Sequence, residues 1–313
     1  MRKKILITGV AGFIGSNLAK HLLKKNYQIY GIDNLSTGFK KNIPKAVKFY
    51  FKDLSKKNSL DSIKFNCDYI FHFAGQSSGE KSFEDPFRDI SNNTLSTINI
   101  INYAKKKKVK KIIYASSMSV YGDSKTGYFN ENSALRPKSF YGVSKKASED
   151  YLKISGSKIN YIILRLFNIY GPGQDLSNLK QGMVSIYLAQ ALKNKKIIVK
   201  GSKNRFRDFT SIDDLCLICE RLISHKINNK VINIGTGKKT KIYELLSLIE
   251  KFTGKRKIIY EKETPGDQFG AVANNKLMKK ILNFNEFLDM ESQLQEFFSW
   301  AKKKYDKKNN FNR

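Results

Sequence analysis

Short apolar runs rich in β-branched residues alternate with segments of helical period along this chain, and no other feature restricts the possible fold as much. Parallel strands need a crossover between them, usually a helix, so this alternation predicts a parallel sheet with helices on both faces. We therefore expect an α/β protein. The predicted strands are Lys4–Thr8, Gln28–Asp33, Val47–Asp53, Tyr69–Ala74, Lys111–Ser117 and Tyr161–Phe167.

The order of these elements also predicts how the chain divides into domains. Right-handed crossovers give a doubly wound, Rossmann-type sheet over residues 1–167, which we expect to bind a dinucleotide. After residue 167 the alternation loosens, and residues 171–182 carry the Gly, Pro, Asn and Gln of a loop. We expect residues 168–313 to form mainly a smaller substrate-binding domain, apart from a strand near 230–235 that returns to the edge of the first sheet.

Charge is the unusual feature of the composition, because 58 Lys and Arg against 27 Asp and Glu give a formal net charge of +31. Such a chain attracts nucleic acid or acidic lipid, but its lysines are scattered over the whole length, which favours a solvated surface of biased composition over a nucleic-acid interface. No window holds the roughly 18 apolar residues of a membrane helix, and no leader-like series precedes the first strand. Together with only three cysteines, this predicts a cytoplasmic protein without a membrane partner.

A glycine triplet follows the first predicted strand in TGVAGFIG and places Gly9, Gly12 and Gly15 at the start of a helix. Gly9 permits the tight turn, Gly12 lets the backbone approach a pyrophosphate, and Gly15 lets the helix pack closely on the strand. Free amides at the helix terminus then face the anion. A glycine-rich turn without a ligand is the alternative, but the position in the first βαβ unit favours a dinucleotide site.

Two aspartates end the strands that follow this turn. Asp33 closes the second strand, where a carboxylate accepts hydrogen bonds from a ribose diol and repels a 2′-phosphate, which favours NAD over NADP. Asp53 closes the third strand and is expected either to contact the adenine or to cap a following helix. The other cofactor contacts expected in the same crevice are Phe13, Ile14, Asn34, Leu54, Phe73, Ala74 and Gly75.

Tyr141 and Lys145 lie four residues apart in YGVSK, inside a predicted helix over residues 139–154, so both side chains project from one face. An ammonium beside a phenol favours the phenolate, and a nearby oxidised nicotinamide adds to this effect, so we expect the pKa of Tyr141 to fall from about 10 toward working pH. Ser117 ends the fifth strand, where open sheets place their ligands, and its hydroxyl can bridge to a substrate oxygen. This spacing also occurs by chance on amphipathic helices, but beside the glycine triplet it predicts a catalytic trio.

With these blocks, the chain resembles the extended short-chain dehydrogenase/reductase family, and in particular its nucleotide-sugar epimerases and dehydratases. The matching segments include DNLSTG, HFAG, SSMSVYG, LRLFNIYGPGQ, RDFTSIDDL and NIGTG. The resemblance implies that Ser117, Tyr141 and Lys145 are catalytic and that Tyr141 and Lys145 also contact the cofactor. It further implies that Asn93 lies near the cofactor, that Asn168 and Arg207 hold the nucleotide diphosphate, and that two subunits pair as a homodimer. A pair between Arg207 and Asp208 or Asp213 is the structural alternative.

Departures from the family pattern favour one activity. The related dehydratases carry acids where this chain has Met118 and Ser119, and these two side chains cannot shuttle the proton of an elimination. The resemblance then implies NAD-dependent 4-epimerisation of a UDP-hexose or UDP-N-acetylhexosamine through a transient 4-keto sugar. An NAD(P)H-dependent reductase of a nucleotide 4-keto sugar is the alternative, and a nucleic-acid-binding protein on the same fold is a remote one.

The resemblance also indicates residues around the sugar and the phosphates. Alignment on the late PGD block places Ala271 where the family controls access of the 2-substituent, and its small side chain leaves room for an acetamide. The block often carries a phosphate-binding arginine where this chain has Thr264, so Arg205 or Lys262 is expected to substitute for it.

Several other residues are interpreted as structural. Cys216 and Cys219 form a CxxC inside a predicted helix with no second pair, so we expect core packing and no metal site. His72 lies between Phe71 and Phe73 in a buried strand pattern, which favours a structural histidine over a general base.

Overall fold

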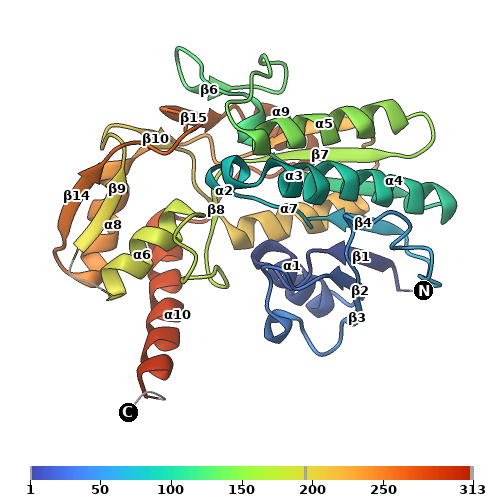
Figure 1. Cartoon of the computed structure of the whole chain (residues 1–313), viewed down its shortest axis with the longest axis horizontal. Helices are drawn as coiled ribbons and strands as arrows, with labels where there is room; N and C mark the ends of the chain where they lie inside the picture. The colour runs from blue at the N-terminus through green and yellow to red at the C-terminus, as the bar shows by residue number, and fades with distance from the viewer. Residues whose placement is uncertain (1, 194–195, 311–313) are drawn as a thin grey trace.

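A seven-stranded parallel sheet forms the centre of the computed structural model, which describes residues 2–193 and 196–310 (Figure 1). All six neighbouring strand pairs run parallel, and the order reverses direction beside β1. In spatial order the strands are β12 (Lys230–Ile234), β7 (Tyr161–Leu166), β5 (Lys111–Ser117), β4 (Tyr69–His72), β1 (Lys4–Thr8), β2 (Gln28–Asp33) and β3 (Lys48–Phe51).

The predicted α/β fold is confirmed, with all six predicted strands present and the late strand β12 paired to β7 at the sheet edge. The strands β3, β4 and β7 are one to three residues shorter than predicted. The central strand β5 is buried over its whole length, which explains why it is a continuous apolar run rather than an alternating one.

Helices cover both faces of this sheet, and each face has its own core. One core joins the sheet to α1 (Phe13–Lys24), α7 (Ile212–Ser224) and α9 (Lys276–Leu282). The other joins it to α4 (Ser96–Lys106) and α5 (Phe140–Ser155). The chain enters α4 through α2 (Gly79–Glu84), α3 (Pro86–Ile90) and a single π-helical turn at Ser91–Leu95.

A third core lies outside the seven-stranded sheet, at the left of Figure 1. It is built from residues after 167, mainly on the helices α6, α8 and α10 and the parallel pair of β9 and β14. The bounds are α6 (Met183–Lys193), β9 (Lys196–Lys200), α8 (Ile242–Thr253), β14 (Lys257–Glu261) and α10 (Met290–Asn310).

Short elements connect the two parts of the chain. A mixed sheet contains β13 (Thr240–Lys241), β10 (Phe206–Arg207), β15 (Gly270–Ala273) and β6 (Tyr128–Phe129), and β8 (Ile169–Tyr170) pairs with β11 (Thr210–Ser211). Two 3₁₀ turns complete the description, at Lys40–Asn42 and Met118–Val120.

A buried ion pair lies between α5 and β7. The Glu149 carboxylate accepts from Arg165 Nε at 2.9 Å and from Nη2 at 2.7 Å, and neither side chain is more than 2% exposed. Ser116 on β5 donates to the same carboxylate at 2.6 Å. These charged hydrogen bonds therefore fix the carboxyl end of β5, which carries Ser117.

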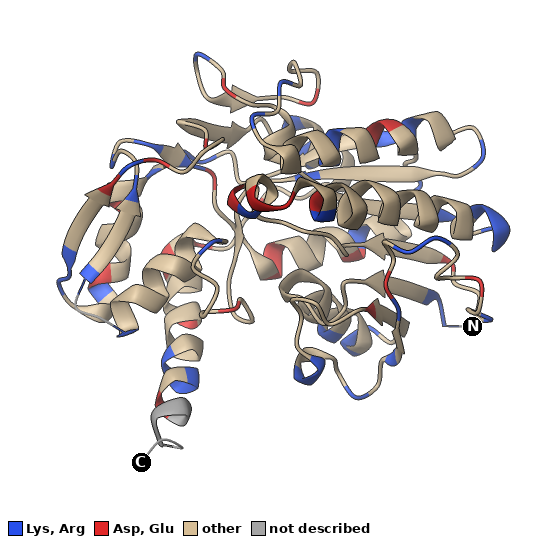
Figure 2. Cartoon of the chain, in the orientation of Figure 1, with Lys and Arg blue, Asp and Glu red and all other residues tan. Residues whose placement is uncertain are grey.

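Lysine and arginine side chains are spread over helices, loops and strand ends (Figure 2). This distribution resembles the solvated surface expected from the sequence. Within the described ranges, no helix combines the length and apolar character needed to cross a membrane.

Candidate active site

A cleft of about 1370 Å³ opens at the carboxyl ends of the parallel strands, where ligands bind in open α/β sheets. Most residues predicted from the sequence line it, although they come from segments far apart in the chain. These are Gly9, Gly12, Phe13, Ile14, Gly15, Asp33, Asn34, Asp53, Leu54, Phe73, Ala74, Gly75, Ser117, Tyr141, Lys145, Asn168 and Arg207.

The glycine turn between β1 and α1 leaves no room for side chains. Gly9 has φ +70°, and a Cβ atom on it would lie 2.8 Å from the backbone nitrogen of Ala74. A Cβ on Gly15 would overlap the carbonyl oxygen of Gly9. Gly12 is the N-cap of α1 and offers no side chain to the first amides of the helix. These amides remain available for an anion in the cleft, as a dinucleotide requires.

Asp33 joins this turn to the end of β2. Its carboxylate accepts from Ala11 N at 3.0 Å and from Leu35 N at 2.7 Å, and burial raises its pKa. Asp53 accepts from the backbone and hydroxyl of Ser55 at 2.9 and 2.7 Å. No helix follows Asp53, so the capping alternative is wrong, since the chain forms turns there.

Ser117, Tyr141 and Lys145 converge on the same cleft. The helix α5 begins where predicted because the Ser139 hydroxyl accepts from Gly142 N at 3.1 Å. Lys145 Nζ donates to the carbonyl of Ala115 at 2.9 Å and lies 5.8 Å from the centroid of the Tyr141 ring. The Ser117 hydroxyl donates to Ser119 Oγ at 3.1 Å, and it lies close enough to the Tyr141 hydroxyl to influence its pKa.

Burial shifts both titratable groups of this trio. It raises the pKa of Tyr141 to about 12, although the nearby Ser117 hydroxyl opposes the shift. It also lowers the pKa of Lys145 to about 8. The pKa of Tyr141 therefore moves in the direction opposite to our prediction, because desolvation of the phenolate outweighs the favourable contacts within the protein chain.

Asn93 does not line the cleft but lies behind it, in the π-helical turn. Its Nδ2 donates to Asp89 Oδ1 and to Ser144 Oγ, each at 3.1 Å. A Cβ on Gly75 would overlap Asn93 Oδ1, so only glycine fits between this amide and the cleft. Asn93 thus lies directly behind a residue of the cleft wall, and its expected place near the cofactor stays a prediction.

Asp89 is a buried acid that the sequence analysis missed. It accepts from Gln76 Nε2 at 2.8 Å and from Ser144 Oγ at 2.6 Å. Its charge adds to the rise in the pKa of Tyr141 that burial causes and opposes the fall in the pKa of Lys145. Its spacing of four residues from Asn93 on one helical face was the only signal in the sequence.

Arg207 and Asn168 line the cleft as expected. Arg207 pairs with Asp267 at 2.6 Å, not with Asp208 or Asp213, so the specific pairs named as the structural alternative are wrong. Asn168 has φ +34° and donates from Nδ2 to the carbonyl of Asp208 at 2.9 Å.

The late PGD block lines the cleft, but Ala271, the residue aligned from it, does not. Ala271 is fully buried beside Arg207 in the mixed sheet, packs in a small apolar cluster and does not line the cleft. The structure therefore contradicts its predicted position at the sugar, because strand pairing turns this residue into the core. Of the two expected substitutes for the phosphate arginine, Arg205 lines the cleft and the exposed Lys262 does not.

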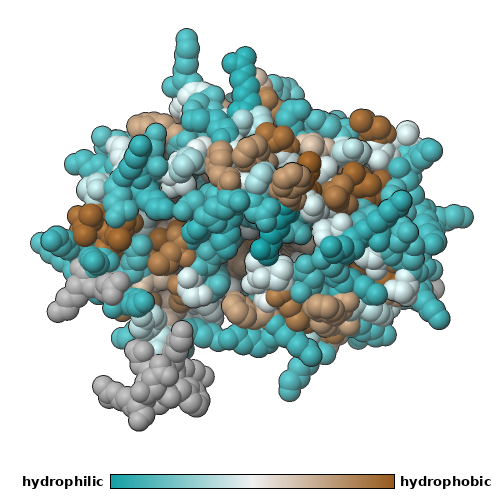
Figure 3. All heavy atoms as spheres, in the orientation of Figure 1, coloured by the Kyte–Doolittle hydropathy of each residue, from teal (hydrophilic) through white to brown (hydrophobic). Residues whose placement is uncertain are grey.

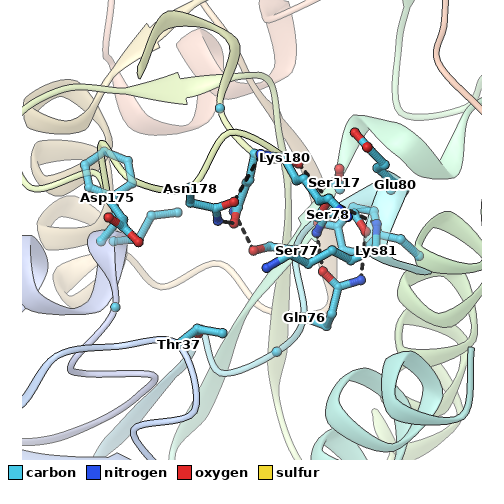
Figure 4. Close-up of a pocket in the computed structure, with 18 of the residues that line it drawn as sticks. Thr37, Gln76, Ser77, Ser78, Glu80, Lys81, Ser117, Asp175, Asn178 and Lys180 are labelled. Carbon is cyan, nitrogen blue, oxygen red and sulfur yellow. Dashed lines mark hydrogen bonds between the residues drawn. The ribbon is translucent and has the colours of Figure 1, made fainter. Parts of the chain in front are cut away.

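Polar contacts also connect the two sides of the cleft (Figure 4). Ser78 donates to the carbonyl of Lys180 at 2.8 Å, and Lys200 pairs with Glu80 at 3.2 Å. Lys180 also pairs with Glu84. Spacing along the chain gave no sign of these residues, because they pair across 96 to 120 positions.

The residues interpreted as structural are buried. His72 lies 2.7 Å from Thr8 Oγ1 and 3.2 Å from Thr97 Oγ1, and burial lowers its pKa to about 3, so it stays neutral as a structural residue. Cys216 and Cys219 are buried free thiols in α7. In the part of the chain that the structure describes, no group of three His, Cys, Asp or Glu side chains could hold a metal ion.

Comparison with known proteins identifies the same arrangement. Residues 5–235 match the model of the NAD dependent epimerase/dehydratase family. A Methanocaldococcus jannaschii protein, whose name provisionally assigns it as a UDP-glucose 4-epimerase, is 35% identical over 303 residues, which cover 95% of this chain and 98% of that relative.

Two solved structures extend this similarity to the whole fold. The UDP-glucose 4-epimerase of Thermotoga maritima with UDP-glucose superposes with a TM-score of 0.92 at 28% identity, covering 96% of this chain and 99% of that one. A UDP-N-acetylglucosamine 4-epimerase of Methanobrevibacter ruminantium, in complex with UDP-N-acetylmuramic acid, gives 0.89 at 27% identity, with 97% and 99% covered.

Proposed function

This chain belongs to the NAD-dependent epimerase/dehydratase family, and from that premise we propose that it interconverts a UDP-hexose or UDP-N-acetylhexosamine with its C4 epimer. The observation that carries the proposal is the convergence of Ser117, Tyr141 and Lys145 on a cleft that also contains the dinucleotide turn. Met118 and Ser119 line the same cleft and supply no acid for elimination. Both related epimerase structures described above act on UDP-sugars, which supports this substrate class.

NAD fits the residues present. The cradle around Gly9 and Gly15 excludes any Cβ, and the open amides of α1 suit a pyrophosphate. Asp33 would accept from the adenosine ribose, and its charge opposes a 2′-phosphate. When bound, NAD supplies a hydride acceptor that later returns the hydride to the sugar.

The protein side of the reaction follows from the trio. Tyr141 Oη takes the proton of the sugar O4 hydroxyl, and Ser117 Oγ hydrogen-bonds to the same oxygen. Lys145, held by the Ala115 carbonyl, stabilises the negative charge that Tyr141 carries before it accepts this proton. After the 4-keto sugar has turned over, Tyr141 returns the proton to O4 as the hydride returns to C4, which gives the epimer.

Asn168 and Arg207 hold the diphosphate while the sugar turns. Both line the cleft, and the positive charge of Arg207 suits a phosphate. Binding energy at the nucleotide, remote from C4, keeps the intermediate in place during the turn. Plain hexoses and N-acetylhexosamines both remain within the proposal, because Ala271 does not line the cleft.

A panel of UDP-sugars tests this function. We expect the purified protein to convert UDP-glucose or UDP-N-acetylglucosamine to the C4 epimer without added cofactor, with protein-bound NAD released on denaturation. Stoichiometric consumption of NAD(P)H with a 4-keto sugar would instead establish the reductase. Binding of RNA at physiological salt without sugar turnover would establish the nucleic-acid alternative.

We further propose that residues 1–167 with β12 form the NAD-binding domain and that residues 168–313 mainly bind the substrate. The separate core around α6, α8 and α10 supports this division. A cytoplasmic protein without a nucleic-acid or membrane partner remains part of the proposal.

Exposed apolar side chains support a homodimer. Apolar side chains gather over α3 and α5 (Figure 3), and the exposed ones include Phe87 at 84% and Ile154 at 81%. The two helical segments pack side by side, so a second copy would cover both faces at once in a four-helix contact. We expect a dimer in sedimentation velocity and a monomer for Phe87→Glu; a wild-type monomer would contradict the proposal.

A further inference from the structure

Two arginines share a single carboxylate on the substrate side of the cleft. Asp267 accepts from Arg207 Nη2 through Oδ1 at 2.6 Å and from Arg205 Nη1 through Oδ2. Both guanidinium groups are at least 96% buried, whereas Asp267 is 27% exposed. Two positive charges therefore face one negative charge, and the cluster keeps a net charge of +1 in a region with little water.

The two guanidinium groups differ in the donors they keep. A guanidinium has five N–H donors. Arg207 uses four of them, on Asp267 and on the carbonyls of Phe206, Phe269 and Gln268. Arg205 uses three, on Asp267 and on the carbonyls of Lys200 and Ser202. Among the described residues, Arg205 thus keeps one N–H on each terminal nitrogen, whereas Arg207 keeps only that of Nε.

The chain builds a specific seat for Arg205. Gly201 has φ +83°, and a Cβ on it would lie 3.0 Å from Arg205 Nε and 3.1 Å from Cζ. The backbone at Gly201, directly after β9, therefore lies against the guanidinium group. A buried charge is costly unless it is paired. Two buried arginines share one carboxylate here, so we infer that a bound anion supplies the second negative charge.

We propose that Arg205 is a substrate-binding residue that supplies the second positive charge of the diphosphate subsite. Arg205 neutralises Asp267, so that the charge of Arg207 is not cancelled by this carboxylate, and its two remaining donors face the nucleotide diphosphate. This inference rests on the proposed function, because it takes the anion to be the diphosphate of a UDP-sugar. It selects Arg205, in the loop before β10, over Lys262 as the residue that makes the phosphate contact missing at Thr264.

Binding of UDP and of uridine, measured by calorimetry, separates this role from a structural one. Arg205→Gln should weaken UDP by at least about tenfold and leave uridine within about twofold, because only UDP carries the phosphates. The control Lys262→Gln removes the same charge from a nearby exposed residue outside the cleft and should change neither. Equal losses for UDP and uridine, or an unchanged affinity for UDP, would overturn the proposal.

Charge restoration gives a second, independent arm. Arg205→Gln combined with Asp267→Asn returns the cluster to +1 and should recover a large part of the lost UDP affinity. Arg205→Lys keeps the charge and should lose less than Arg205→Gln. A double variant that binds UDP no better than Arg205→Gln, while retaining its circular dichroism and bound NAD, would contradict the charge argument. If the wild-type protein binds no UDP at all, the proposed function fails rather than this inference.

Discussion

The pH profile of turnover follows from two opposed pKa shifts in the catalytic trio. Burial raises the pKa of Tyr141 to about 12 and lowers that of Lys145 to about 8. The active form needs Tyr141 deprotonated and Lys145 protonated. Below pH 8 the phenolate fraction rises tenfold per pH unit. Because Lys145 is still half protonated at pH 8, kcat/KM should rise by about 50-fold from pH 6 to pH 8.

Above pH 8 the two effects cancel. The phenolate fraction still rises, but the protonated fraction of Lys145 falls by the same factor, so the profile should be level until about pH 12. The pH at which the kcat/KM profile becomes level is a property of the coupled pair rather than of either residue. The positive charge of a bound nicotinamide lowers both pKa values, so about 8 is the upper limit for the position of the bend.

Initial rates with a saturating coupling enzyme between pH 5.5 and 9.5 measure this profile. Lys145→Met has no ammonium group to lose its proton above pH 8, so the remaining activity should keep rising with the phenolate fraction. A wild-type rate that is independent of pH between 6 and 8, or one that rises steadily through pH 9.5, would refute the reasoning.

Three further variants test separate parts of the account. Tyr141→Phe should reduce turnover by about 100-fold or more while UDP-sugar binding in calorimetry stays within about twofold, and full activity would remove Tyr141 from its role. Gly15→Ala places a Cβ on the Gly9 carbonyl, so protein-bound NAD measured after denaturation should drop by about tenfold or more, and unchanged NAD content would contradict the cradle. Glu149→Gln leaves Arg165 buried without its partner and should lower the free energy of unfolding in urea by about 3 to 5 kcal/mol. The exposed control Glu291→Gln, which loses a pair with Lys251, should cost less than about 1 kcal/mol, and equal costs would argue against burial as the cause.

Sequence patterns were sufficient for the parts of the fold that depend on neighbours in the chain. The strand β5 and the helix α5 have nearly the predicted bounds, because apolar period and the cap Ser139 determine them locally. The glycine turn was equally predictable, since its spacing follows from one βαβ unit.

Contacts between distant segments were not predictable in the same way. Asp267 lies 60 positions from Arg207 in the chain, so neither its choice as partner nor the shared pairing with Arg205 could be derived from spacing. The pKa of Tyr141 was predicted in the wrong direction, because a four-residue spacing to Lys145 reveals the charge but not the degree of burial. Ala271 was misplaced because alignment gave its position in the chain but not the side of β15 that it occupies.

The central claim is that the sugar is oxidised at C4 and that the same hydride returns to it. UDP-glucose carrying deuterium at C4 tests this directly when it is incubated with the purified protein in ordinary water and both epimers are analysed by NMR. The account predicts that deuterium is retained at C4 in substrate and product alike while epimerisation reaches equilibrium. Loss of deuterium from C4 in step with epimerisation would contradict it, since the hydrogen would then have exchanged with solvent.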